Sequence, residues 1–283
     1  MAFWKWGRVT LTALGLFALA ACGYSVQTTS GRDYLQNFED YAASATQGPD
    51  ENSGAGSRSD QIHQALHAAA AVEPILTFPA RFGLARIDRG GLTPIPESEA
   101  AHWRALAADL GPGWGEFVPI SPLIAAFTHT EVAPLDQELC HGWRLERNYA
   151  DCLGQVVHGI RLGAARQHVD AVLVYEGTAW SKSAENALGL AKLTIVGFWL
   201  APTESIEAGA AAQALLLDVR NGYTYGHAQS ELLDSAETIT PSVGSSAVAD
   251  DMRGEALNQA VAALVPQVKS MLYDLRLQLA EGN

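Results

Sequence analysis

The sequence predicts an α/β domain with α+β character in its second half. We expect a mixed sheet of about five or six strands, flanked by helices and closed by a long C-terminal helix. Residues 81–88 (RFGLARID) alternate as a strand does, and residues 171–175 (AVLVY) form the continuous apolar run typical of a strand buried on both faces. Asn221-Gly222 joins two β-type segments, residues 213–220 and 223–229, and this dipeptide is a strong hairpin signal.

The first half of the chain alternates helices with strands, which predicts right-handed crossovers and parallel strands. Asp60 caps a helix that carries apolar residues on one face and ends before Pro74. The strand at residues 81–88 follows, with Arg81, Arg86 and Arg89 expected as its solvated flanks.

A second helix is predicted from Ser98 to residue 110, where Gly111 ends it. A short strand at residues 116–121 contains Pro119, which places it at an edge or a strand end. Trp103 and Trp114 are expected to pack in the core.

The second half is predicted to change from parallel to antiparallel pairing. A helix at residues 150–168 leads into the strand at residues 171–175, and residues 178–191 are expected to form a loop or short helix. Residues 192–200 (KLTIVGFWL) predict a strand too short to span a bilayer as a helix. After a loop at residues 238–246, a helix should run over residues 248–281, with Pro266 kinking or splitting it. Its predicted apolar stripe is Met252, Ala256, Ala260, Leu264, Val268, Met271, Leu275 and Leu279.

The N-terminus carries the pattern of a bacterial lipobox, Leu19-Ala20-Ala21-Cys22, after Lys5, Arg8 and the apolar residues 9–19. The pattern resembles the diacylglyceryl lipoprotein signal and implies lipid on Cys22, the one side chain here that can form a thioether to diacylglycerol. The alternative is an ordinary signal peptide or an uncleaved anchor with an incidental Cys22.

Three segments follow from this interpretation. Residues 1–21 are the signal peptide, residues 22–60 the lipidated cysteine and a flexible tether, and residues 61–283 a single periplasmic domain. Tyr34, Leu35, Phe38 and Tyr41 interrupt the tether at helical spacing and predict a short helix that packs on the domain, or a docking segment. Gly23 stands where an aspartate would indicate retention, so we expect the periplasmic face of the outer membrane, with the inner membrane as the alternative.

The charge of the chain argues against nucleic acid as a partner. Removing residues 1–21 takes away two basic residues and no acidic one, so the net charge falls from −13 to −15. The partners expected are the membrane, through lipid on Cys22, and other envelope proteins.

Two cysteines besides Cys22 remain to be assigned. In an oxidising compartment Cys140 and Cys152 are expected to form a disulfide, with two free thiols as the alternative. A metal site formed by these two with His141 and His158 matches no zinc spacing, so no metal is expected.

The sequence contains no recognisable catalytic motif, which predicts that the protein is not an enzyme and needs no cofactor. His63 and His67 lie four residues apart on one helix face but lack a third metal ligand. Asp218 is expected to cap a turn or face solvent. Ser121, a histidine and Asp218 have the residue types of a catalytic triad, but nothing in the sequence brings the three together.

Several short segments resemble the uncharacterised rhombotail lipoproteins over residues 78–228. The matching motifs are Val169-Asp170, Thr194-Ile195-Val196-Gly197 and Leu217-Asp218-Val219. The chain departs from that family near Asn283, where it has no Gly-Gly sorting tail. More distantly it is similar to the N-terminal α/β domains of the curli-secretion channel and of the Tol-system translocation protein.

These observations favour a non-enzymatic lipoprotein that binds other envelope components. The alternatives are a subunit of an oligomeric export channel, which would need residues 178–191 to join strands between neighbours, and an envelope hydrolase with no recognisable motif.

Overall fold

A computed structural model describes residues 23–36, 58–126, 145–185, 204–230, 233–234, 238–240 and 245–282. Within these residues no helix is both long enough and apolar enough to cross a bilayer. The helices are α2 (Arg58–Ala70), α3 (Glu97–Leu110), α6 (Leu145–Arg166) and α8 (Ser245–Glu281). The strands are β1 (Tyr24–Val26), β2 (Ala80–Asp88), β3 (Gly91–Thr93), β4 (Gly115–Pro119), β5 (Ala171–Glu185), β6 (Glu204–Asp218), β7 (Thr224–Gln229), β8 (Leu233–Asp234) and β9 (Thr238–Thr240).

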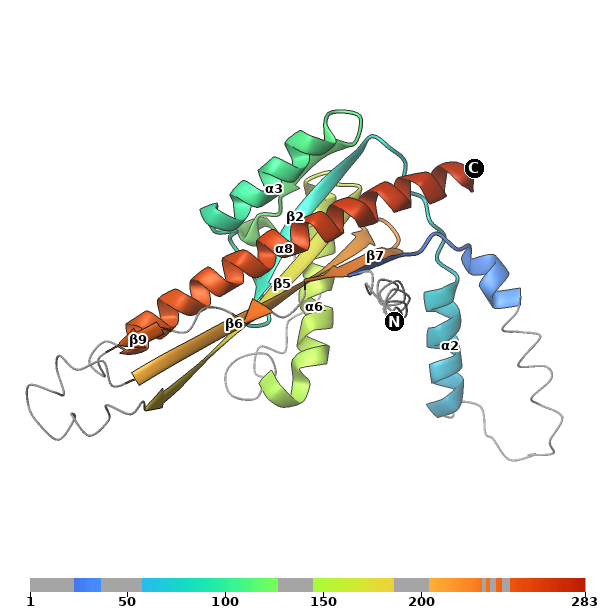
Figure 1. Ribbon diagram of the computed structural model, residues 1–283. Coiled ribbons are helices and arrows are strands. Elements are labelled where there is room, and N and C mark those ends of the chain that lie inside the picture. The colour runs from blue at the N-terminus through green and yellow to red at the C-terminus, as the bar shows by residue number, and fades with distance from the viewer. Residues whose placement is uncertain are drawn as a thin grey trace, which may run out of the picture.

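All nine of these strands belong to one mixed sheet, which confirms the predicted fold class. The order is β1-β7-β6-β5-β2-β3, with β4 paired to β2, and β8 and β9 paired to β6 (Figure 1). β2 is parallel to β4 and β5, whereas β5, β6 and β7 are antiparallel, as predicted for the two halves. The strands outnumber the five or six expected because β1, β3, β8 and β9 have only two or three residues each, too few to show a pattern.

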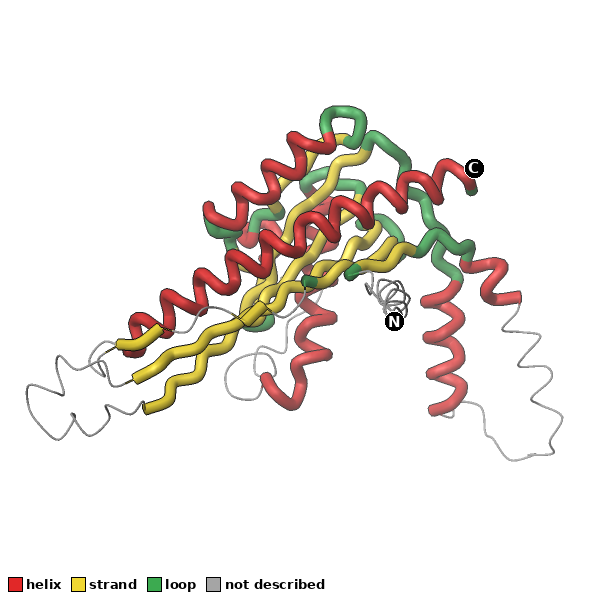
Figure 2. Tube along the Cα trace, in the orientation of Figure 1, coloured by secondary structure: helices red, strands yellow, loops and turns green. Residues whose placement is uncertain are grey.

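Helices cover both faces of the sheet, α3 and α8 on one and α6 on the other (Figure 2). α8 lies along β5 and β6 because the strand residues that face it are small. A Cβ added to Gly177 would overlap a methyl carbon of Leu257, and Ala208, Ala210 and Ala212 of β6 are all buried. Trp103 and Trp114 are buried in this layer, as predicted.

α8 is continuous through Pro266, so the predicted split does not occur. Pro266 lies on the exposed side of the helix, while Leu264 and Val268 on either side of it are fully buried. Packing of the buried side against the sheet holds both halves in one helix, although the proline cannot donate its backbone hydrogen bond.

The prediction of a loop or short helix at residues 178–191 is wrong for residues 178–185, the part of this range that the structure describes. β5 and β6 have 15 residues each and pair from Ala171↔Asp218 to Glu185↔Glu204. The small and polar residues of this part of β5 gave no apolar alternation, and the strand forms because β6 and α8 pack against it. The predicted strand at residues 192–200 lies outside the described residues.

The predicted loop at residues 238–246 is also wrong at both ends. β9 pairs with residues 204–206 of β6, and α8 already begins at Ser245. Pairing with a distant strand decides the structure of so short a segment, which has no pattern of its own.

The N-terminal segment differs from the predicted tether. Tyr24–Val26 pair with β7, and the Tyr24 hydroxyl donates to Asp274 of α8 at 2.7 Å. Residues 31–36 are helical, whereas Phe38 and Tyr41 lie outside the described residues. The sheet therefore begins two residues after Cys22.

α2 forms where a helix was expected, but its apolar side is not buried. Ile62 and Leu66 are 53% and 50% exposed. The helix stands away from the sheet (Figure 1), so amphipathic spacing predicted the helix correctly and its packing wrongly.

Candidate functional site

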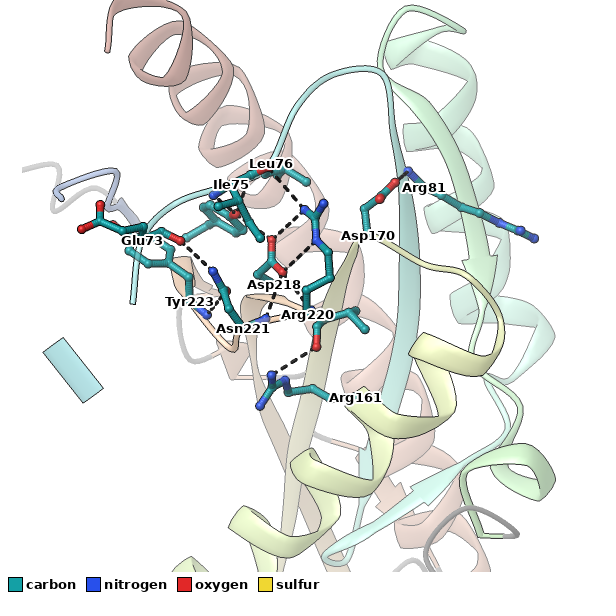
Figure 3. Close-up of polar contacts among 12 residues, drawn as sticks. Glu73, Ile75, Leu76, Arg81, Arg161, Asp170, Asp218, Arg220, Asn221 and Tyr223 are labelled. Atoms are coloured by element: carbon teal, nitrogen blue, oxygen red, sulfur yellow. Dashed lines mark hydrogen bonds and ion pairs between the residues drawn. The ribbon is translucent and has the colours of Figure 1, made fainter. Parts of the chain in front are cut away.

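The first buried polar group, the Asp218 cluster, lies at the end of β6 and consists of Asp218, Arg220, Asn221 and Tyr225. Figure 3 shows Asp218, Arg220 and Asn221 of this cluster. Asp218 has no exposed surface. Its Oδ1 accepts a hydrogen bond from the backbone N–H of Arg220 at 2.8 Å, and its Oδ2 accepts from the Tyr225 hydroxyl at 2.8 Å and from Arg220 Nη2 at 3.0 Å. Asp218 thus caps the turn, one of its two expected roles, but it does not face solvent.

Tyr225 links the cluster to the segment that precedes β2. Its hydroxyl accepts hydrogen bonds from the backbone N–H groups of Ile75 and Leu76 at 3.1 and 2.8 Å. Burial raises the pKa of Tyr225, and the hydrogen bond and charge of Asp218 raise it further, so the hydroxyl stays protonated and donates to the carboxylate.

The turn of the β6–β7 hairpin is part of the same structure. Asn221 Nδ2 donates to the Glu73 carbonyl at 2.7 Å, and Arg161 Nη2 donates to the Val219 carbonyl at 3.1 Å. The predicted hairpin is confirmed, but its turn is longer than the two-residue form expected for Asn221-Gly222. The N–H of Gly222 bonds to the Asp218 carbonyl, and of the turn residues only Gly222 has positive φ. The β6–β7 hairpin is therefore hydrogen-bonded both to the segment that precedes β2 and to α6.

The set of Ser121, a histidine and Asp218 is not assembled. Ser121 follows β4, and β2 and β5 lie between β4 and β6, a separation of about 14 Å at 4.8 Å per strand. Ser121 Oγ instead accepts from the N–H of Ile124 at 3.4 Å. The hydrogen bonds of the Asp218 cluster accordingly stabilise the fold and include no catalytic set.

The histidines provide one Ser–His contact. Ser25 Oγ lies 2.7 Å from Nδ1 of His227 on an exposed strand pair. Among the described residues no carboxylate is hydrogen-bonded to His227, and no group of three or more potential metal ligands occurs, His63 and His67 included. Cys22 and Cys140, and the side chain of Cys152, lie outside what the structure describes, so the lipidation and disulfide predictions stay predictions.

A second buried group, the Arg86 cluster, was missed by sequence reasoning. It consists of Arg86, Glu99 and Tyr175. Arg86 Nε donates to the Glu99 carboxylate at 3.0 and 3.2 Å, and the Tyr175 hydroxyl donates to Glu99 Oε2 at 2.8 Å. Arg86 is 9% exposed and Glu99 3%, so the prediction of Arg86 as a solvated flank is wrong. One feature of the sequence could have indicated the burial of Arg86: in the alternation of the strand it lies on the same face as the apolar residues Phe82 and Leu84.

The electrostatics of the Arg86 cluster follow from burial of these charges. Burial lowers the pKa of Arg86, but Glu99 and Asp88 outweigh it, so the net pKa is raised and the guanidinium stays charged. Burial is also the largest cause of the raised pKa of Tyr175, followed by the negative charge of Glu99. Arg86 therefore stays charged beside Glu99, and Tyr175 keeps the proton that it donates to Glu99.

The outer half of β5 forms an open edge, which we define as Gly177–Ala184. β2 pairs with β5 only as far as Ile87↔Glu176, and beyond this no strand in the described part of the chain pairs with that side of β5. Ser181 faces α8, where its Oγ accepts from Arg253 Nη1 at 3.0 Å. Trp180 and Lys182 therefore lie on the opposite face, with Lys182 Nζ 4.9 Å from the Trp180 ring centroid.

A hollow of about 400 Å³ lies on the sheet face opposite α8. Its lining includes Val174 of β5 and Leu215 of β6 on the sheet, Leu153 and Val157 on α6, and Gln229 on β7. α6 covers this face only in part, and Leu215 is half-buried. The lining is mainly apolar, as in ligand pockets of this size.

Comparison with known proteins identifies no family. No family model matches the chain, and no curated protein matches it. Among solved structures, the chain is similar to a dodecamer of a PelC point variant from Paraburkholderia phytofirmans at 14% identity, covering 67% of this chain and 93% of that chain with a TM-score of 0.24. A TM-score this low supports no conclusion on function.

Proposed function

We propose that this protein is a non-enzymatic envelope lipoprotein, anchored through Cys22 on the periplasmic face of the outer membrane, that binds another envelope protein by strand addition at the open edge. The observation that carries the proposal is the open edge itself. An unpaired strand edge presents a row of N–H and C=O groups that an extended chain can pair with.

The surroundings of the open edge support pairing with a protein. α8 covers one face and β6 pairs along the other side, so β5 is held extended before any partner arrives. Trp180 and Lys182 give the opposite face an aromatic and a cationic contact beside the edge. Preorganisation of this kind reduces the entropy lost on binding.

Photocrosslinking tests the proposal. A photoreactive residue at Thr178 or Ala184, in protein extracted in mild detergent, should give a discrete adduct with another chain. The same residue at Asp251, an exposed position of α8, is the matched control and should give none.

Proline substitutions test whether backbone pairing makes the contact. Consecutive edge residues direct their N–H groups alternately toward the neighbouring strand and outward. One of Ser183→Pro and Ala184→Pro should therefore remove an outward donor, abolish the adduct and leave thermal stability unchanged. Adducts that form equally at Asp251, or that survive both substitutions, would contradict the proposal.

The second candidate is a subunit of an oligomeric export channel. The observation that favours it is that Thr178–Glu185, where a loop or short helix was expected, form a strand that a second copy could extend. The native mass of the acylated protein in mild detergent separates the candidates. A ring-sized homo-oligomer with β5-to-β5 or β5-to-β9 crosslinks favours the channel, and a complex with a different chain favours the adaptor.

A further inference from the structure

We propose that the hollow on the α6 side of the sheet holds one fatty acyl chain of the lipid carried by Cys22. The inference rests on the proposed lipid anchor and adds a binding site to it. The site is the mainly apolar cavity of about 400 Å³ between α6 and the strands β5, β6 and β7.

The described chain begins beside this cavity. Gln229 of β7, which lines the cavity, donates its backbone N–H to the carbonyl of Gly23. Tyr24 pairs with Ala228, another residue of the lining, so β1 is the strand next to the cavity. Cys22 precedes Gly23 by one Cα–Cα step of about 3.8 Å.

This arrangement places the lipid attachment point within reach of the cavity. Gly23 lies one strand spacing, about 4.8 Å, from Gln229, and Cys22 is the residue joined to Gly23 by the peptide bond. An extended fatty acyl chain is longer than that distance. The tether expected after Cys22 would have separated lipid and domain, but β1 starts at Tyr24 and leaves no spacer.

The chemistry of the cavity favours a neutral chain that is already attached. Val174 and Leu215 offer an apolar surface, whereas the carboxylate at the rim belongs to Glu176 and the mature chain carries a net charge of −15. A free fatty acid or an anionic phospholipid would bring negative charge toward this rim. The acyl chains on Cys22 are joined by ester and amide bonds and bring none.

The membrane anchor stays stable when one of its acyl chains leaves the bilayer and binds in the cavity. A lipoprotein cysteine that is diacylated and N-acylated carries three chains, and two are enough for stable anchoring. The third chain covers apolar surface around Leu215 that otherwise faces water. It would also hold the β1 and β7 side of the domain at the bilayer surface, which orients the open edge.

Intramolecular crosslinking tests the assignment. Cells are fed a palmitate analogue that carries a diazirine, irradiated, and the full acylated protein is purified in mild detergent and mapped by peptide mass spectrometry. We expect a crosslink between the Cys22 peptide and a peptide containing Val157 or Leu215. Val157→Trp, which fills the cavity, should remove most of this crosslink, and Leu123→Trp, at a position that is 82% exposed, should leave it unchanged.

The outcomes separate this proposal from the lipid anchor on which it rests. If Cys22 is acylated but its crosslinks reach only phospholipid, detergent or peptides outside the cavity, the site is wrong and the anchor stands. If the Leu215 peptide carries a phospholipid adduct, the cavity binds lipid of the bilayer and not the chain of Cys22. If Cys22 carries no acyl chain, both proposals fail. Leu215→Phe, a smaller insertion, replaces Val157→Trp should that variant not fold.

Discussion

The buried Arg86 cluster makes Glu99→Gln the most informative single substitution. The change keeps the size of the side chain and removes its negative charge, so Arg86 is left buried with Asp88 and Thr93 as its remaining partners, at 3.2 and 2.9 Å. Breaking a buried ion pair by removing one partner costs about 3–5 kcal/mol. Asp88 remains in place and its side chain is 42% exposed, so we expect a loss of about 3 kcal/mol, at the lower end of that range.

The assay is urea unfolding followed by tryptophan fluorescence. Trp103 reports directly, because its ring centroid lies 5.0 Å from that of Tyr175. The double variant Arg86→Met/Glu99→Leu replaces both charges with apolar side chains, so it should be more stable than Glu99→Gln, and the cycle with the single variants gives the coupling energy.

A clear result would contradict this reasoning. Glu99→Gln within about 0.5 kcal/mol of the unaltered protein, the range of ordinary surface substitutions, would mean that the pair is not buried in solution. Such a result would also mean that the hydrogen bond from Tyr175 to Glu99 does not form in a buried site.

Three further predictions concern the rest of the fold. The raised pKa values of Tyr175 and Tyr225 keep both hydroxyls protonated in the folded state, while tyrosines of the unfolded chain ionise above about pH 10. The contribution of these two tyrosines to the free energy of unfolding should therefore be constant up to about pH 10 and then fall by up to about 1.4 kcal/mol per pH unit for each tyrosine, and Tyr175→Phe should reduce the slope above about pH 10; an unchanged slope in urea titrations would refute this. Gly222→Ala should cost about 1–2 kcal/mol in urea unfolding, because φ is +80° and the new Cβ would lie 2.9 Å from an Arg161 nitrogen; a neutral effect would mean that the turn relaxes. Leu264→Ala should lower the free energy of unfolding by about 2–5 kcal/mol, while the matched Leu277→Ala, at a position that is 62% exposed, should change it by less than about 0.5 kcal/mol; equal effects would refute the packing of α8.

Several features could be predicted from the sequence because their causes are local. β2 follows from the alternation of residues 81–88, and the first part of β5 from the apolar run at residues 171–175. The β6–β7 hairpin follows from Asn221-Gly222. Gly111, with φ of +79°, ends α3 where it was expected to. Each depends on side-chain periodicity or on a backbone conformation that few residues adopt.

The buried polar groups depended on contacts between distant segments. Asp218 accepts a hydrogen bond from Tyr225 of the next strand, and Arg86 meets Glu99 across the β2–α3 crossover, and no spacing in the sequence specifies either pair. A lone arginine or aspartate in a strand is more often solvated, so its burial is visible only once the partner is in place.

The sequence by itself determined the fold class, the parallel and antiparallel halves, and the expectation of lipid on Cys22. Only the tertiary structure decided that β1 leaves no spacer after Cys22, that Thr178–Glu185 form a strand, and that α6 covers its face of the sheet in part. The physical reason is common to all three. Short or weakly patterned segments take their conformation from the strands and helices they pack against, and those neighbours are far away in the sequence.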